Sequence, residues 1–134
     1  MRILGIDPGS LATGFGVVER VDAKLAHVAH GTLRPPRTAS LSHRLGVLHD
    51  ELRRVIEEHE PDAAVVERVF VSASAGSALV LGQARGAALA ALGAAGLAVH
   101  ELAAREVKKA VVGTGAASKA QVQKMVSEIL GLRA

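Results

Sequence analysis

Apolar residues recur along this chain with two different periods, and the change between the periods predicts its elements. The first third holds short, dense apolar runs that are typical of buried strands. We expect three such strands, at residues 2–7, 13–21 and 24–34. Because only short turns separate them, they are expected to pair as an antiparallel meander. Simple alternation along the third strand would place His27 and His30 on opposite faces.

From Leu41 onward the apolar residues recur at intervals of three and four, which indicates an amphipathic helix. Beyond this helix, strands and helices alternate. We expect strands at 62–69 and 97–102, and helices at about 76–94, at 103–113 and from Ser118 to Gly131. The apolar residues expected on the inner face of the last helix are Val122, Met125, Val126, Ile129 and Leu130. This order predicts an α/β fold in which helices flank a mixed five-stranded sheet, its first three strands antiparallel.

The composition agrees with one folded domain. The chain has 134 residues, of which 49% are hydrophobic, and a formal net charge of +3 that permits an anionic partner. It has no cysteine, which excludes disulfides and thiolate metal sites and suits the cytoplasm, where we expect the protein. Residues 77–99 are a candidate membrane span. They include Gln83 and Arg85 and are rich in Ala and Gly, so we expect a soluble helix and no membrane partner.

Two acidic residues, Asp7 and Glu67, lie within otherwise apolar strands. Burial of an unpaired carboxylate is costly or forces its protonation. One explanation is that each acid sits at the end of its strand, paired with an arginine or capping a helix. Since both lie toward the C-terminal ends of strands that can be neighbours, the other explanation is a shared ligand site at that edge. Two converging carboxylates suit Mg²⁺ or Mn²⁺, which support phosphoryl transfer.

An aromatic residue and several lysines are candidates for contact with nucleic acid. Phe70 follows Glu67 by three residues, and an aromatic there can stack on a base or simply close the core. Phe15, in the middle of a strand, is expected in the core. Lys108 and Lys119 flank a Gly-Thr-Gly link. A lysine in the first turn of a helix opposes the helix dipole, so Lys119 is either a solvated surface residue or a phosphate contact.

Four segments occur in order and span nearly the whole chain: LGIDPGS, TGFGVVE, VVERVFVSASAGSALVLGQARG and AAREVKKAVVGTGAASKAQVQKMV. In these motifs the chain resembles the RuvC family of Holliday-junction resolvases. The resemblance implies an RNase H-like fold and a homodimer. Such a dimer nicks two symmetric strands of a four-way DNA junction during recombination and repair, using two Mg²⁺ or Mn²⁺ ions in each active site. A junction-migrating helicase complex is a further partner that the resemblance implies.

The resemblance also implies roles for individual residues. By position, Asp7 and Glu67 match the first two catalytic, metal-binding carboxylates of the family. Phe70 matches the aromatic residue that contacts the junction. Lys108 and Lys119 match basic residues near the scissile phosphate.

Two further implications concern the C-terminal end of the chain and the dimer contact. The family carries two more active-site aspartates in a segment that would follow Ala134. We therefore expect residues 1–134 to form a single RNase H-like nuclease domain that is incomplete at its C-terminus, binds metal weakly, and cleaves slowly or not at all. The family's dimer contact lies along the helix after Phe70. There, Gly82 and Gly86 would allow two helices to approach closely, although packing within one soluble chain explains them equally well.

Other functions stay open on the sequence alone. An actin-like ATPase or sugar kinase also begins with a Gly-x-Asp-x-Gly turn, but those enzymes need two such domains. An RNase H-like nuclease that acts on other nucleic acids would share the fold. A junction-binding module without catalytic activity is a third alternative for a chain that carries two of the expected carboxylates.

Overall fold

The computed structural model describes residues 1–68 and 74–132. Within them the elements are β1 (Arg2–Asp7), β2 (Thr13–Val21), β3 (Lys24–Leu33), α1 (Leu41–His59), β4 (Ala63–Arg68), α2 (Ala75–Ala94), β5 (Ala98–Ala103), α3 (Ala104–Val112) and α4 (Lys119–Leu130). The predicted strands were correct to within one residue at each end.

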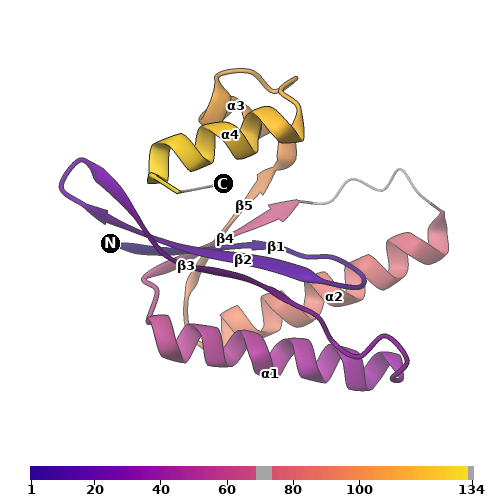
Figure 1. The fold of residues 1–134 in the computed structure, drawn as a ribbon. Coiled ribbons are helices and arrows are strands. Elements are labelled where there is room, and N and C mark those ends of the chain that lie inside the picture. The colour runs from indigo at the N-terminus through magenta and orange to yellow at the C-terminus, as the bar shows by residue number, and fades with distance from the viewer. Residues whose placement is uncertain (69–73, 133–134) are drawn as a thin grey trace.

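The strands form one five-stranded mixed sheet in the order β3-β2-β1-β4-β5 (Figure 1). The first three strands are antiparallel, as the short turns predicted. β4 runs parallel to β1, and β5 runs parallel to β4. Each parallel step is made through a helix, α1 before β4 and α2 before β5, which is the usual way to return the chain to the same end of a sheet.

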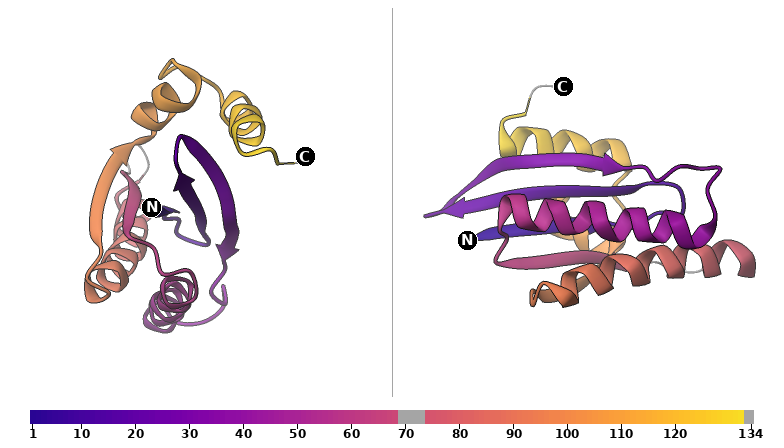
Figure 2. Two further views of the ribbon diagram at one scale, coloured as in Figure 1. Left: turned by 90° about the vertical axis from the view of Figure 1, so that its left-hand side faces the viewer. Right: turned by 90° about the horizontal axis from the view of Figure 1, so that it is seen from below.

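The helices lie in two groups, α1 and α2 against one face of the sheet and α3 and α4 on the other side (Figures 1 and 2). The hydrophobic core lies between the sheet and α1 and α2. Its central residues are aliphatic: Leu4, Ile6, Val17, Ala64, Val66, Leu48, Leu52, Ala88 and Leu92. Phe15 is half-buried and packs against this core, as predicted.

The second helical group is packed much less tightly. Neither α3 nor α4 contains a buried residue. Ile129, which we expected on the inner face of α4, is 50% exposed. That expectation was wrong because α4 packs against α3 and the edge strand β3 rather than across the sheet.

The expected alternation along β3 was also wrong. Val17 pairs with Ala29, whereas the next residue of β2, Val18, pairs with His27, so β3 carries one extra residue at this point. Such a β-bulge shifts the side chains that follow it by one position. His27 and His30 therefore meet, with Nε2 and Nδ1 2.9 Å apart.

Candidate active site

The sheet register brings Asp7 and Glu67 side by side. In the parallel pair β1–β4, Ile6 lies opposite Val66, so the next residue of each strand is one of the two acids. Ile6 and Val66 are buried against α1 and α2. Since side chains alternate along a strand, both carboxylates project to the other face, where α3 lies. The two acids converge at the C-terminal edge of two neighbouring strands.

The electrostatics of Glu67 reflect this convergence. Partial burial raises the pKa of the Glu67 carboxyl above its ordinary value of 4.5. Asp7 raises it further, through its negative charge and through a hydrogen bond between the two side chains. The positive charge of Lys108 acts in the opposite direction and lowers the pKa of Glu67. Asp7 and Lys108 therefore act on the Glu67 carboxyl in opposite directions, as close charged neighbours of it.

The turn after Asp7 allows little freedom. A side chain at Gly9 would overlap the carbonyl oxygen of Ala12, so glycine is required there. The Gly9 N–H donates to Thr13 Oγ1 at 3.5 Å, and Thr13 is 1% exposed. The turn thus directs the chain away from Asp7 and leaves its side chain exposed to solvent.

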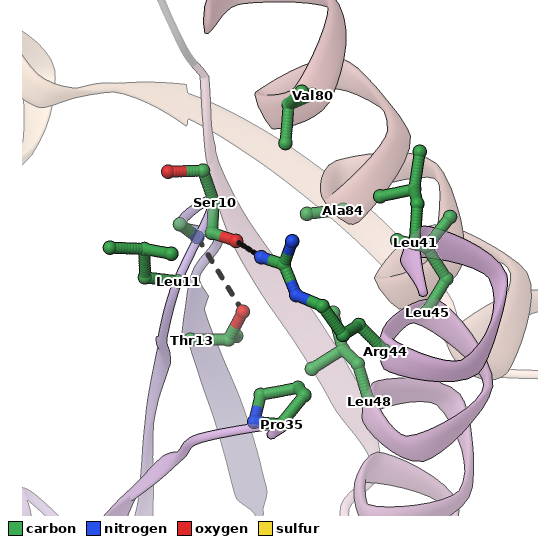
Figure 3. Close-up of a pocket in the computed structure, with 11 residues that line it drawn as sticks. Ser10, Leu11, Thr13, Pro35, Leu41, Arg44, Leu45, Leu48, Val80 and Ala84 are labelled. Carbon is green, nitrogen blue, oxygen red and sulfur yellow. Dashed lines mark hydrogen bonds between the residues drawn. The ribbon is translucent and has the colours of Figure 1, made fainter. Parts of the chain in front are cut away.

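Arg44 of α1 binds the backbone of the same turn. Its Nη2 donates to the Ser10 carbonyl oxygen at 2.5 Å, as Figure 3 shows. Leu41, Leu45, Val80 and Ala84 surround this guanidinium in a small pocket between α1, α2 and the turn. Arg44 therefore ties the loop that follows Asp7 to the helical layer.

The two lysines are placed differently. Lys108, on α3, is half-buried and close enough to Glu67 to act on its pKa. Lys119 is the exposed first residue of α4. Its helix begins with the predicted capping box, since Ser118 N–H donates to Gln121 Oε1 at 2.7 Å and Gln121 N–H donates to Ser118 Oγ at 3.1 Å. Phe70 lies outside the described residues.

Sequence reasoning missed two arginines beside the carboxylates. Arg44 holds the turn after Asp7, and Arg85 of α2 donates from Nη1 to the Glu67 carbonyl oxygen at 3.0 Å. The sequence signal for them was a cation on an otherwise apolar side of a helix. Since a buried arginine needs specific hydrogen-bond acceptors, such a residue indicates a contact with another element. From the sequence alone, Arg85 indicated only that residues 77–99 are not a membrane span.

Within residues 1–68 and 74–132, no group of three or more His, Asp or Glu side chains is arranged to hold a metal ion. The candidate metal site in this part of the chain thus consists of the two carboxylates. Carboxylate oxygens are nevertheless the ligands that Mg²⁺ and Mn²⁺ prefer.

Comparison with known proteins gives a consistent result. The family model of the crossover junction endodeoxyribonuclease RuvC matches residues 3–134. RuvC of Bordetella avium is 52% identical over 132 residues, which cover 98% of this chain and 73% of that protein. RuvC of Geobacter sulfurreducens is 51% identical over 132 residues, covering 98% of this chain and 80% of the relative.

Solved structures agree with these sequence matches. The Thermus thermophilus RuvC in complex with a Holliday junction substrate superposes with a TM-score of 0.93 at 33% identity, over all of this chain and 82% of that one. The yeast mitochondrial Holliday junction resolvase Ydc2 shares the fold, with a TM-score of 0.67 at 13% identity over 94% of this chain and 62% of its own. The fold is RNase H-like, as predicted. Family model, relatives and structures together show that this chain belongs to the RuvC family of crossover junction endodeoxyribonucleases.

Proposed function

We propose that this protein resolves four-way DNA junctions by metal-dependent hydrolysis, with Asp7 and Glu67 as its metal-binding, catalytic carboxylates. Membership of the RuvC family supports the reaction. The adjacency of the two acids at the C-terminal edge of β1 and β4 is the observation that carries the site. When bound there, Mg²⁺ or Mn²⁺, two ions in each site, would supply an activated water and neutralise charge on the scissile phosphate and the leaving oxygen.

The donor set fits such a metal. Two facing carboxylates repel each other, and that repulsion is part of what raises the pKa of Glu67. A divalent cation held between the two carboxylates would offset that repulsion. Asp7 is exposed, so a phosphate can approach it from solvent. The residues of the chain thus provide negative charge on an accessible edge, which is what a hard cation requires.

The same face carries the two lysines that are proposed to contact DNA. Lys108 lies beside Glu67, and Lys119 is exposed at the start of α4, on the same side of the sheet. We assign both lysines to phosphates of the junction, and Phe70 to stacking on a base or a base pair. Lysine contacts to phosphate position the substrate without reading its sequence, which suits an enzyme that must recognise the shape of a junction.

We assign the exposed side of α2 to a homodimer contact. By length and composition α2 is apolar enough to cross a membrane, yet only 22% of its apolar window is buried in the described structure. One side packs into the core through Ala84, Ala88, Ala91 and Leu92. The other side exposes small residues, Gly82, Gly86 and Gly93, together with Leu79, which is 64% exposed. A second copy of this helix would cover that side, because small residues let two helices approach closely.

The dimer proposal is tested by the molar mass in light scattering. Leu79→Lys is expected to shift the protein toward monomer. Leu25→Lys, a matched change at a residue of β3 that is 47% exposed, is expected to leave the mass unchanged. If Leu79→Lys keeps the same mass as the parent protein, α2 is not the contact.

Family membership supports two further proposals. A junction-migrating helicase complex is a second partner, and the cytoplasm is the compartment in which both would meet chromosomal DNA. Co-purification of the helicase with the protein in the presence of a four-way junction would support the partnership.

The central experiment measures binding and cleavage side by side, on a four-way junction and on a linear duplex of the same sequence. Preferential binding of the junction, and symmetric nicks that require Mg²⁺ or Mn²⁺, are expected. Asp7→Asn and Glu67→Gln are expected to abolish the nicks while junction binding without metal persists. If either variant nicks at the parental rate, the carboxylate site is misplaced.

Junction binding without cleavage is a second candidate function. One observation favours it: the described residues supply only two carboxylates at the site, and no larger group of metal ligands. The central experiment separates the two candidates, since a binding module would hold the junction as tightly and leave all four strands intact at every metal concentration.

A further inference from the structure

Arg85 makes contacts that join the active-site edge of the sheet to the helical layer. Its side chain is 16% exposed. Nη1 donates to the backbone carbonyl oxygen of Glu67 at 3.0 Å, while Nη2 donates to the carboxylate of Glu101 on β5. One guanidinium thus contacts two neighbouring strands at once, at the positions where both approach the C-terminal edge.

The residue that accepts from Nη1 is the one whose side chain faces Asp7. β4 ends at Arg68, one residue after Glu67. At Glu67 the strand still pairs with Leu102 of β5, but its register with β1 ends at Val66, so the sheet supports this peptide mainly from one side. The side chain of a strand residue follows the orientation of its own peptide plane. A contact that fixes the Glu67 carbonyl therefore also fixes the direction in which the Glu67 carboxylate leaves the strand.

We propose that Arg85 is a positioning residue that holds Glu67 in the orientation required for metal binding, an inference that rests on the proposed function of the Asp7–Glu67 pair. A planar guanidinium has two terminal nitrogens that reach the carbonyl and the Glu101 carboxylate together, whereas lysine has one. Glu101 keeps the guanidinium in place, and Arg68 Nε, 3.9 Å from Glu101 Oε2, supports this carboxylate from the other side.

Stability alone does not account for this arrangement. The Glu101 side chain is 40% exposed, and an ion pair that water reaches contributes little to folding. Apolar residues are abundant on α2, so an aliphatic side chain would suit the core at least as well. An aliphatic side chain cannot donate to the Glu67 carbonyl oxygen. The contact therefore indicates a role in orienting Glu67 and not mainly in stabilising the fold.

The test compares Arg85→Lys with Arg53→Lys. Arg53 is a matched control, because it also pairs with acidic side chains, Asp50 and Glu57, but lies on the exposed side of α1. Mn²⁺ alone is the probe, and its affinity is measured by electron paramagnetic resonance of the free ion. Thermal unfolding and metal-free junction binding are measured on the same samples.

Arg85→Lys is expected to weaken Mn²⁺ binding by about tenfold or more, the usual effect of removing a group that orients a metal ligand. Its unfolding temperature and junction affinity are expected to stay near the parental values, and Arg53→Lys is expected to change none of the three. Parental Mn²⁺ affinity in a folded Arg85→Lys overturns the inference.

Two additional measurements keep the result interpretable. If Arg85→Lys does not fold, Glu101→Gln takes its place, since it weakens the acceptor that holds the guanidinium and is expected to weaken Mn²⁺ binding in the same direction. Unchanged Mn²⁺ affinity in folded Glu101→Gln overturns the inference. Asp7→Asn distinguishes a failure of the proposed Arg85 role from a failure of the proposed metal site. If Asp7→Asn loses Mn²⁺ while Arg85→Lys retains it, only the role of Arg85 fails. If the parental protein binds no Mn²⁺, the proposed metal site fails as well.

Discussion

Removing the charge of Glu67 is expected to stabilise the metal-free protein at neutral pH. Partial burial and the neighbouring Asp7 raise the pKa of Glu67 above 4.5, so the fold favours the protonated carboxyl. This favourable contribution is fully present below about pH 4.5 and is lost as the pH rises through the raised pKa of the folded state. At pH 7.5 two carboxylates face each other, and Glu67→Gln removes one of the two charges.

The size of the effect depends on how strongly solvent screens the repulsion between the two carboxylates. Two like charges about 4 Å apart repel by about 1 kcal/mol in water and by about 4 kcal/mol in the less polar surroundings of a protein surface. Asp7 is exposed and Glu67 is only partly buried, so solvent screens the pair and the lower figure applies. A gain of about 1 kcal/mol corresponds to a rise of about 3–5 °C in the unfolding temperature of a domain of this size.

The assay is thermal unfolding of the parental protein and Glu67→Gln at pH 4.0 and pH 7.5, with EDTA and with Mg²⁺. The variant is expected to unfold at a higher temperature at pH 7.5 in EDTA, and the difference is expected to vanish at pH 4.0. Mg²⁺ is expected to stabilise the parental protein more than the variant. Glu58→Gln, at a side chain that is 75% exposed, controls for the loss of one negative charge. A Glu67→Gln protein that is less stable at pH 7.5, or whose advantage persists at pH 4.0, refutes the reasoning.

Three further changes test other parts of the molecule. Lys108→Gln is expected to weaken junction binding and to lower the slope of log affinity against log salt by about 1, as loss of one phosphate contact would; an unchanged slope contradicts that role. Gly31→Val is expected to destabilise the fold by about 1–3 kcal/mol in urea, because a side chain there meets the Phe15 ring at 2.9 Å, whereas Gly16→Ala has open space and serves as the control. Phe70→Ala is expected to weaken junction binding by about 1–3 kcal/mol, measured by titration; a change confined to thermal stability would favour a core role.

The sheet was predictable from sequence because its signals are local. Dense apolar runs and short turns define β1, β2 and β3, and the switch to helical spacing at Leu41 defines the crossover that makes β4 parallel to β1. Once two parallel strands are neighbours, their C-terminal ends must share an edge. The meeting of Asp7 and Glu67 followed from that topology, without knowledge of any side-chain contact.

What the sequence did not reveal depends on single insertions and on contacts between distant elements. The extra residue in β3 that brings His27 to His30 has no local signature in an apolar run. The exposure of Ile129 follows from where α4 docks, and helical periodicity cannot specify a docking site. Arg85 acts on Glu67 across 18 positions in the chain, so its role becomes visible only when α2 lies beneath β4.

The two helical groups divide the work of the site. α1 and α2 form the core with the sheet and supply Arg44 and Arg85, which hold the backbone beside each carboxylate. α3 and α4 contain no buried residue and carry Lys108 and Lys119. Few buried contacts imply a low cost of local movement. Under the function proposed above, Asp7 and Glu67 would bind metal and need a fixed geometry, whereas Lys108 and Lys119 would contact the DNA. The firmly packed half then positions the carboxylates, and the loosely packed half is free to adjust to DNA.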